Sequence, residues 1–191
     1  MLACYLLVVR YKVERGAIGR AGGRSVLGRM SRLHKVFVYG TLKRGEPNHG
    51  WFSKDAGGYF KFMGEAKTVE KYPLIIGTKY NIPFLLYSPG EGTNVKGELY
   101  EVNDKVFANL DILEDHPNYY IREEREVQCL EDNKKVTTWI YFIKNFKSEL
   151  LKQTTFESYS SEGPHGLKYV SRYLRDDSSN HRLDIFPSEK S

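Results

Sequence analysis

The order of short strand-like runs around a single helical stretch constrains the fold more than any other feature. Residues 105–115 have apolar side chains at the three- and four-residue spacing of one helical face. Strand-like runs surround this stretch, separated by turns rich in Gly, Pro and Asn, at 36–39, 59–63, 74–76, 84–87, 97–102, 119–129 and 136–142. Strands and helices do not alternate, which disfavours a doubly wound sheet. We therefore predict an α+β fold with a small, curled sheet or barrel.

Three regions of different composition divide the chain. Residues 1–32 form a basic leader rich in Arg and Gly, residues 33–174 contain the strand and helix patterns, and residues 175–191 form a polar tail that we expect to be unordered. Two interpretations of the leader remain open. It is either a mitochondrial presequence or an untranslated stretch, with synthesis starting at Met30, and the second is favoured.

Charge and hydropathy argue against several classes of protein. Six of the 29 basic residues but one of the 24 acidic residues fall within residues 1–29, so the rest of the chain has no net charge. A nucleic-acid surface needs basic residues clustered on the folded part, so we expect no nucleic-acid partner. No apolar run approaches the roughly 18–20 residues that span a membrane. We therefore expect a soluble protein without a membrane partner.

Cysteine usage indicates the compartment and argues against a metal site. Cys129 is the sole cysteine of the predicted domain, so it cannot form a disulfide within that domain. This fits a reducing, cytoplasmic location, or a mitochondrial one if the leader is real. The Cys and His residues show no metal-ligand spacing, and we expect no bound metal.

The helical stretch carries a carboxylate on its apolar face. At about 100° per residue, Glu114 falls within the stripe formed by Phe107 and Leu110. Burial and the negative end of the helix dipole both disfavour a charged carboxylate and should raise its pKa. Such a group can accept and return a proton near neutral pH. The alternative is a structural glutamate that reaches solvent or pairs with a cation such as Arg122.

A turn with exposed backbone follows the first strand-like run. In Tyr39-Gly40-Thr41 the middle residue has no side chain to block the backbone N–H groups. Donors of this kind can hold a substrate carboxylate or a developing oxyanion. Alone the signal is weak, because most such turns only change the direction of the chain.

Four segments of the sequence, taken together, are characteristic. They are VFVYGTLKRG at 36–45, Leu-Asp-x-x-Glu at 110–114, Tyr-x-Arg at 120–122 and SYSSEGPHGL at 158–167. The set resembles the AIG2-like branch of the γ-glutamylcyclotransferase-like superfamily, over residues 36–169. The first two segments are typical of the superfamily, and the last points to the branch. The resemblance implies a small mixed β-barrel with flanking helices and a cavity at one side.

The resemblance also implies an activity. The branch contains γ-glutamylaminecyclotransferases, in which the α-amino group of a γ-glutamyl unit attacks its own γ-carbonyl. This closes 5-oxoproline and releases an amine. The implied substrate is γ-glutamyl-ε-lysine, the remnant of digested transglutaminase cross-links. No cofactor is expected because the nucleophile is already in the substrate. The expected partner is thus a small-molecule γ-glutamyl amine, acted on by a monomer.

Site residues follow from the same resemblance. Glu114 matches the general acid/base, and Tyr120 matches a tyrosine of the pocket. The substrate-binding loop is matched by Tyr39, Gly40, Thr41 and Leu42. Arg122 and His165 are further candidates for the pocket lining, although Arg122 fits a structural partner and His165 a solvated turn equally well.

Three other functions are consistent with parts of the sequence. The same machinery could act on γ-glutamyl amino acids or glutathione. The barrel could instead be a non-catalytic binding module, but the intact Tyr39–Leu42 loop and Glu114 argue against it. An RNA-associated role depends only on the leader.

Overall fold

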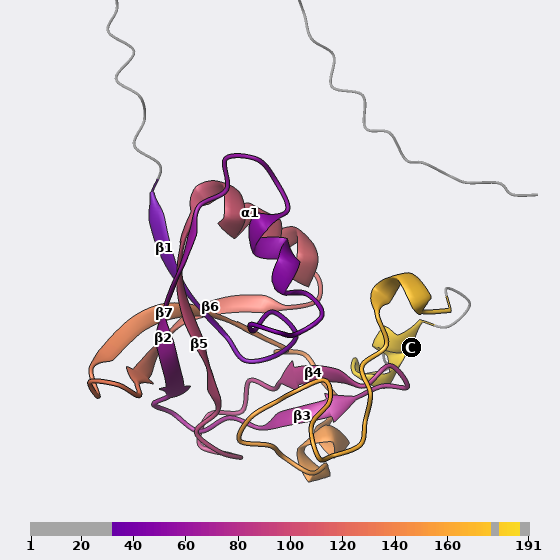
Figure 1. Ribbon diagram of the computed structural model, residues 1–191. Coiled ribbons are helices and arrows are strands. Elements are labelled where there is room, and N and C mark those ends of the chain that lie inside the picture. Colours follow the sequence, from indigo (N-terminus) through magenta and orange to yellow (C-terminus); the bar gives the residue numbers. More distant parts are fainter. Residues whose placement is uncertain (1–31, 177–179, 188–191) are drawn as a thin grey trace, which may run out of the picture. The chain divides into compact units, whose positions relative to one another are not determined.

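The computed structural model describes residues 32–176 and 180–187 (Figure 1). Except for Arg32, the predicted leader lies outside these residues. Five strands form a closed barrel in the order β1 (Leu33–Val38), β5 (Lys96–Asn103), β2 (Phe60–Thr68), β6 (Ile121–Cys129) and β7 (Lys135–Phe142). The pair β1–β7 is parallel and the other neighbours are antiparallel, so the barrel is mixed, as the resemblance implies.

A separate antiparallel pair, β3 (Leu74–Gly77) and β4 (Ile82–Leu85), lies outside the barrel. The described residues also contain one α-helix, α1 (Asp104–Glu114), and four short 3₁₀ helices. These are η1 (His49–Ser53), η2 (Ser148–Lys152), η3 (Arg172–Leu174) and η4 (His181–Asp184). In Figure 1, α1 and η1 lie side by side above the barrel.

Strand alternation produces two apolar clusters. Every barrel strand contributes to the first cluster, whose buried strand residues are Phe37, Leu99, Ala66, Val127, Ile140 and Phe142. Since successive side chains point to opposite faces of a strand, these residues fill the barrel interior. Their neighbours on the opposite face pack with α1 in the second cluster, which includes Val36, Tyr100, Val102, Leu110 and Tyr141.

Local sequence explains both ends of α1. At its start, the Asn103 side chain accepts a hydrogen bond of 3.1 Å from the Val106 N–H, as an N-cap residue does. At its end, Asp115 adopts the left-handed conformation with φ 49°, and its N–H donates to the Asp111 carbonyl. The helix therefore ends at Glu114, one residue before the end of the predicted stretch 105–115.

The polar tail is ordered where the structure describes it, so the expectation of an unordered tail is wrong for residues 180–187. Ile185 is fully buried in the second apolar cluster, and its carbonyl accepts a 2.9 Å hydrogen bond from the Lys147 N–H. Arg182 pairs with Asp115 at 2.6 Å. One buried apolar side chain and one ion pair thus hold a segment whose composition is polar.

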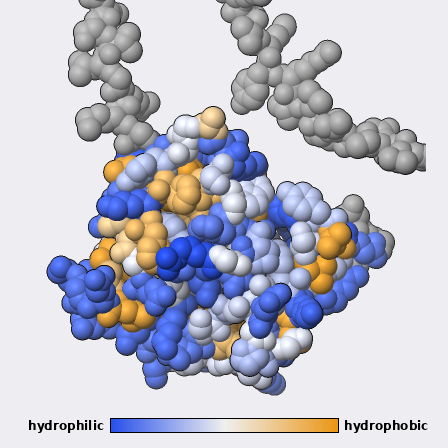
Figure 2. Space-filling view, viewed as in Figure 1, coloured by the Kyte–Doolittle hydropathy of each residue, from blue (hydrophilic) through white to orange (hydrophobic). Residues whose placement is uncertain are grey.

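The surface in Figure 2 is mostly hydrophilic, with separate small hydrophobic patches. Within residues 32–176 and 180–187, no helix is long and apolar enough to cross a membrane.

Candidate active site

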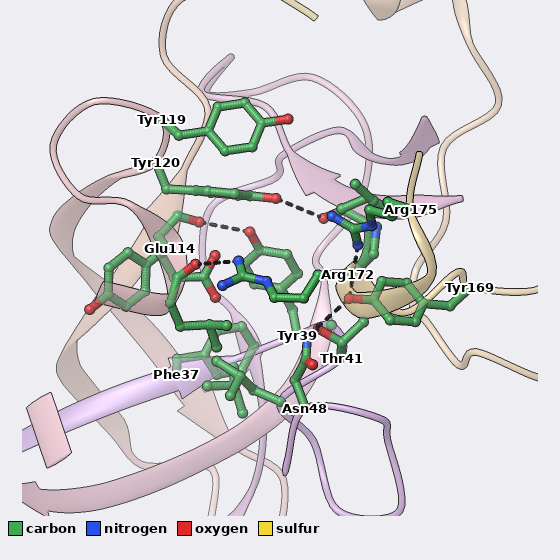
Figure 3. Close-up of a pocket in the computed structure, with 17 residues that line it drawn as sticks. Phe37, Tyr39, Thr41, Asn48, Glu114, Tyr119, Tyr120, Tyr169, Arg172 and Arg175 are labelled. Carbon is green, nitrogen blue, oxygen red and sulfur yellow. Dashed lines mark hydrogen bonds between the residues drawn. The ribbon is translucent and has the colours of Figure 1, made fainter. Parts of the chain in front are cut away.

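A cavity lies where the end of β1, the end of α1 and the chain around η3 meet (Figure 3). Its volume of about 80 Å³ accommodates several water-sized groups, since one such group needs roughly 10–15 Å³. The lining consists of Phe37, Val38, Tyr39, Gly40, Thr41, Leu42, Asn48, Ile82, Pro83, Leu113, Glu114, Tyr119, Tyr120, Tyr141, Tyr169, Arg172 and Arg175. Glu114, Tyr39–Leu42 and Tyr120, all expected from the sequence to form a site, therefore lie around one cavity.

The loop after β1 is fixed by an acidic side chain on β5. Glu98 accepts hydrogen bonds from the backbone N–H of Arg44 at 2.9 Å and from its Nε at 3.1 Å. Tyr100 donates to the same carboxylate at 2.7 Å. A mostly buried carboxylate with three donors holds the loop firmly, because charge-assisted hydrogen bonds are stronger than neutral ones.

Gly40 is required by the close approach of β4. A Cβ atom at this position would lie 2.9 Å from Cγ of Pro83, so any side chain would displace one of the two segments. Among the described residues, the N–H groups of Gly40, Thr41 and Leu42 donate no hydrogen bond to another protein group. They are available to a ligand in the cavity.

Glu114 is the only acidic side chain among the described residues that line the cavity. Its carboxylate forms no hydrogen bond or salt bridge within the part of the chain that the structure describes. Burial raises the pKa of Glu114 to about 7, while the positive charge of Arg172 acts in the opposite direction. Glu114 can therefore exchange a proton near neutral pH.

The neighbouring tyrosines remain protonated and orient the cavity wall. Tyr39 donates to the Tyr141 carbonyl at 2.9 Å, and Tyr120 donates to the Pro83 carbonyl at 3.3 Å. Burial raises the pKa of both Tyr39 and Tyr120 well above the ordinary value. Neither phenol can act as a base near neutral pH.

The cavity lining also contains a group of polar residues that the sequence analysis did not predict. The Asn48 amide donates to Oγ1 of Thr41 at 2.9 Å and to the Tyr169 hydroxyl at 3.1 Å. Arg175 donates to the same hydroxyl at 3.0 Å. Arg172 projects toward Glu114 (Figure 3) and donates to the Leu113 carbonyl at 3.1 Å. No motif or periodicity marks Tyr169, Arg172 or Arg175, so local sequence reasoning could not select them.

Arg122 lies outside the cavity. It pairs with Asp111, and its guanidinium lies 4.3 Å from the ring centre of Phe107. Asp111 also accepts a 2.7 Å hydrogen bond from Tyr141, whose backbone carbonyl holds Tyr39. Arg122 therefore supports the cavity wall from behind, as the structural interpretation predicts, and does not pair with Glu114.

His165 also lies outside the cavity. Its Nε2 is 2.7 Å from the Ser160 carbonyl, and its Nδ1 accepts a 3.0 Å hydrogen bond from the Leu167 N–H. Both ring nitrogens thus serve the turn that contains them. That turn packs on the β1 loop, because Glu46 accepts from the Ser161 N–H at 2.9 Å. This hydrogen bond therefore joins the characteristic segment 158–167 to the loop that continues the characteristic segment 36–45.

Several known proteins are similar to this chain in sequence and in fold. The family model described as "Gamma-glutamyl cyclotransferase, AIG2-like" matches residues 36–161. A Mus musculus γ-glutamylaminecyclotransferase is 44% identical over 146 residues, which cover 73% of this chain and 98% of the relative. A Drosophila melanogaster protein named as a γ-glutamylcyclotransferase is 48% identical over 148 residues, covering 76% of this chain and 94% of the relative.

The crystal structure of an AIG2-like protein from Mus musculus matches with a TM-score of 0.71 at 44% identity, covering 75% of this chain and 99% of that one. This match confirms the predicted mixed barrel. The family model covers more than half of the chain, and the identities extend over nearly the full length of the relatives. The chain belongs to the AIG2-like γ-glutamyl cyclotransferase family.

Proposed function

We propose that this protein is a γ-glutamylaminecyclotransferase, which converts γ-glutamyl-ε-lysine and related γ-glutamylamines to 5-oxoproline and a free amine. One observation carries the proposal. A single carboxyl group with a pKa of about 7 lines the same cavity as Gly40, Thr41 and Leu42, whose N–H groups donate to no other protein group among the described residues. A cyclisation that moves one proton between two nitrogens and develops one oxyanion needs these two elements.

Glu114 is the proton carrier in this mechanism. Its carboxylate takes a proton from the α-amino group of the substrate, whose nitrogen forms a bond to the γ-carbonyl carbon. The tetrahedral intermediate then breaks its original C–N bond, and Glu114 returns the proton to the departing nitrogen. The carboxylate is regenerated at the end, so the reaction needs no other proton donor. A pKa near 7 suits both transfers, because catalysis is most efficient when the pKa lies near the working pH.

The loop after β1 stabilises the charge that develops on oxygen. As the nitrogen adds, the γ-carbonyl oxygen becomes an oxyanion, and the backbone N–H groups of Gly40, Thr41 and Leu42 can donate to it or to the α-carboxylate. Their fixed positions, held through Arg44 and Glu98, reduce the cost of reorganisation during the reaction. Removing one such donor typically costs about 10²–10³ in rate.

Folding of the substrate supplies a further part of the rate. The ring closes only when the flexible γ-glutamyl unit is bent so that its two ends meet. Well-oriented intramolecular reactions can gain about 7–11 kcal/mol over their bimolecular counterparts. The buried rings of Tyr39 and Tyr120 limit the space in which the unit can extend.

A second candidate is the same reaction on γ-glutamyl amino acids or glutathione. The name of the Drosophila melanogaster relative, a γ-glutamylcyclotransferase, favours this candidate, whereas that of the Mus musculus relative favours the amines. The chemistry at Glu114 is identical in both, so only the leaving group distinguishes them.

The proposal is tested by measuring 5-oxoproline released by the full chain from γ-glutamyl-ε-lysine, γ-glutamyl-alanine and glutathione. We expect release from the first and little from glutathione. Glu114→Gln should abolish turnover, whereas Glu131→Gln, the same change in an exposed turn, should not affect it. Full activity of Glu114→Gln would refute the mechanism. Absence of 5-oxoproline from every substrate would favour a binding module.

We further propose that the protein acts in the cytoplasm, where it degrades the remnants of digested transglutaminase cross-links. It acts there as a monomer, without nucleic-acid or membrane partners. This proposal is supported by the single cysteine of the domain and by the absence of net charge outside the leader. Fractionation of cells and size-exclusion chromatography of the full chain test the location and the oligomeric state.

A further inference from the structure

A groove continues the cavity on the side of the C-terminal segment. Its lining includes Leu113, Asp115, Tyr119, Arg172, Arg175 and Arg182. Four of these residues, Leu113, Tyr119, Arg172 and Arg175, also line the cavity. The two hollows therefore meet at a shared wall, which begins one residue before Glu114.

The shared wall contains two guanidinium groups without a carboxylate partner in the described part of the chain. Arg172 donates to the Leu113 carbonyl, and Arg175 donates to the Val170 carbonyl and the Tyr169 hydroxyl, all neutral acceptors. Arg182 differs, because it pairs with Asp115 at 2.6 Å. Two guanidinium groups that hold only neutral oxygens leave donors free for an anion.

The proposed reaction fixes which part of the substrate reaches this wall. The departing nitrogen must lie next to Glu114 to receive its proton, with the γ-glutamyl unit on the side of the Tyr39–Leu42 loop. The rest of the leaving amine must then extend away from that loop. The groove beginning at Leu113 is the continuation of the cavity that the structure offers in this direction.

We propose that Arg172 and Arg175 form a leaving-group subsite, which binds a carboxylate carried at the far end of the departing amine. This inference rests on the proposed function. It selects γ-glutamyl adducts whose leaving group is an amino acid joined through its side-chain nitrogen, over adducts of simple alkylamines. The four-carbon chain of lysine would cross the shared wall, and its carboxylate would meet the guanidinium groups.

The subsite lies beyond the residues that define the family. The family model matches residues 36–161, whereas both arginines follow that stretch. The catalytic part of the cavity thus comes from residues within 36–161, and the part that binds the leaving group comes from residues after 161. Contacts of Tyr169 with Asn48 and of Arg175 with Tyr169 join the two. Selectivity for the leaving amine can then change without a substitution at Glu114.

Two substrates that differ only in the carboxylate test the subsite. They are γ-glutamyl-ε-aminocaproate and γ-glutamyl-pentylamine, and the measured quantity is the ratio of their kcat/KM values with the full chain. A guanidinium–carboxylate contact at a partly exposed site should favour the first substrate by about tenfold or more. Arg175→Gln and Arg172→Gln should each lower this ratio, and the double variant should bring it close to one.

Lys152→Gln provides the matched control, because it removes one positive charge from an exposed position that lines neither hollow. Its ratio should equal that of the unchanged protein, which excludes an effect of net charge. Thermal unfolding of each variant identifies any that fails to fold, and the two single variants then provide independent measurements of the ratio.

Each outcome decides the inference. A ratio near one in the unchanged protein, or a ratio that the arginine variants leave intact, would overturn it while the proposed function stands. Equal losses on both substrates would mean that the arginines bind the γ-glutamyl carboxylate, which also overturns it. Absence of 5-oxoproline from both substrates and from γ-glutamyl-ε-lysine would refute the inference together with the proposed function.

Discussion

Arg172 opposes the effect of burial on Glu114. Its Nη2 donates to the carbonyl of Leu113 at 3.1 Å, which keeps its positive charge beside the carboxyl group of the next residue. Burial raises the pKa of Glu114 to about 7, and the charge of Arg172 prevents a larger rise. A segment far along the chain therefore adjusts the proton affinity of the group at the end of α1.

This relationship predicts the pH dependence of the rate. In the free enzyme Glu114 must be deprotonated to act as a base, so kcat/KM should rise as the pH increases through about 7. Arg172→Gln removes the charge that lowers the pKa of Glu114, and the acid limb of the profile should move to higher pH. The profile of Lys152→Gln should keep its position. An acid limb unmoved in Arg172→Gln would mean that another group controls the rate.

Stability should depend on the same carboxyl group. Folding raises the pKa of Glu114, so the native state binds the proton of this group more tightly than the unfolded state does. This binding stabilises the native state at low pH, and the contribution is lost as the pH rises. It is complete below about pH 4.5, the ordinary pKa of a glutamate, and disappears through about pH 7. The difference corresponds to roughly 3 kcal/mol, since one pKa unit is about 1.4 kcal/mol.

Glu114→Gln lacks this titration. We therefore expect its free energy of unfolding to equal that of the unchanged protein at low pH and to exceed it by up to roughly 3 kcal/mol above pH 7. Urea denaturation at a series of pH values measures the difference. Glu131→Gln should show no such trend, and a pH-independent difference for Glu114→Gln would contradict a raised pKa.

Gly40→Ala should impair catalysis more than stability. The added Cβ would lie 2.9 Å from Cγ of Pro83, so the loop that carries the N–H donors must shift. A displacement of about 1 Å can cost about 10²-fold in rate, and we expect kcat/KM to fall by tenfold to a hundredfold. Gly50→Ala is the control, because its Cβ meets no heavy atom within 4 Å. Equal rates for both variants would remove the loop from the mechanism.

Ile185→Ala should destabilise the fold. The side chain is fully buried in the second apolar cluster, and removing a buried Ile typically costs about 2–5 kcal/mol. Leu183, in the same segment, is 65% exposed, so Leu183→Ala should change the free energy of unfolding by no more than about 0.5 kcal/mol. Chemical denaturation compares the two. Similar values would show that residues 180–187 are not anchored through Ile185.

The sequence by itself determined the elements that depend on local periodicity. The stripe of Phe107 and Leu110 predicted the buried face of α1 and so placed Glu114 at that face. Alternation along the strands and the turn residues between them indicated a barrel-like sheet. These patterns are readable because side chains three or four residues apart in a helix, or two apart in a strand, share an environment.

Only the tertiary structure decided which distant residues join the cavity. Arg172 and Arg175 line the same cavity as Glu114 although they belong to a segment without apolar periodicity. His165 stays outside although it belongs to a characteristic motif. A polar residue at the surface carries no local mark of its partner, because its position depends on how the whole chain packs. Ile185 illustrates the same limit, since one buried side chain orders residues whose composition suggests a free tail.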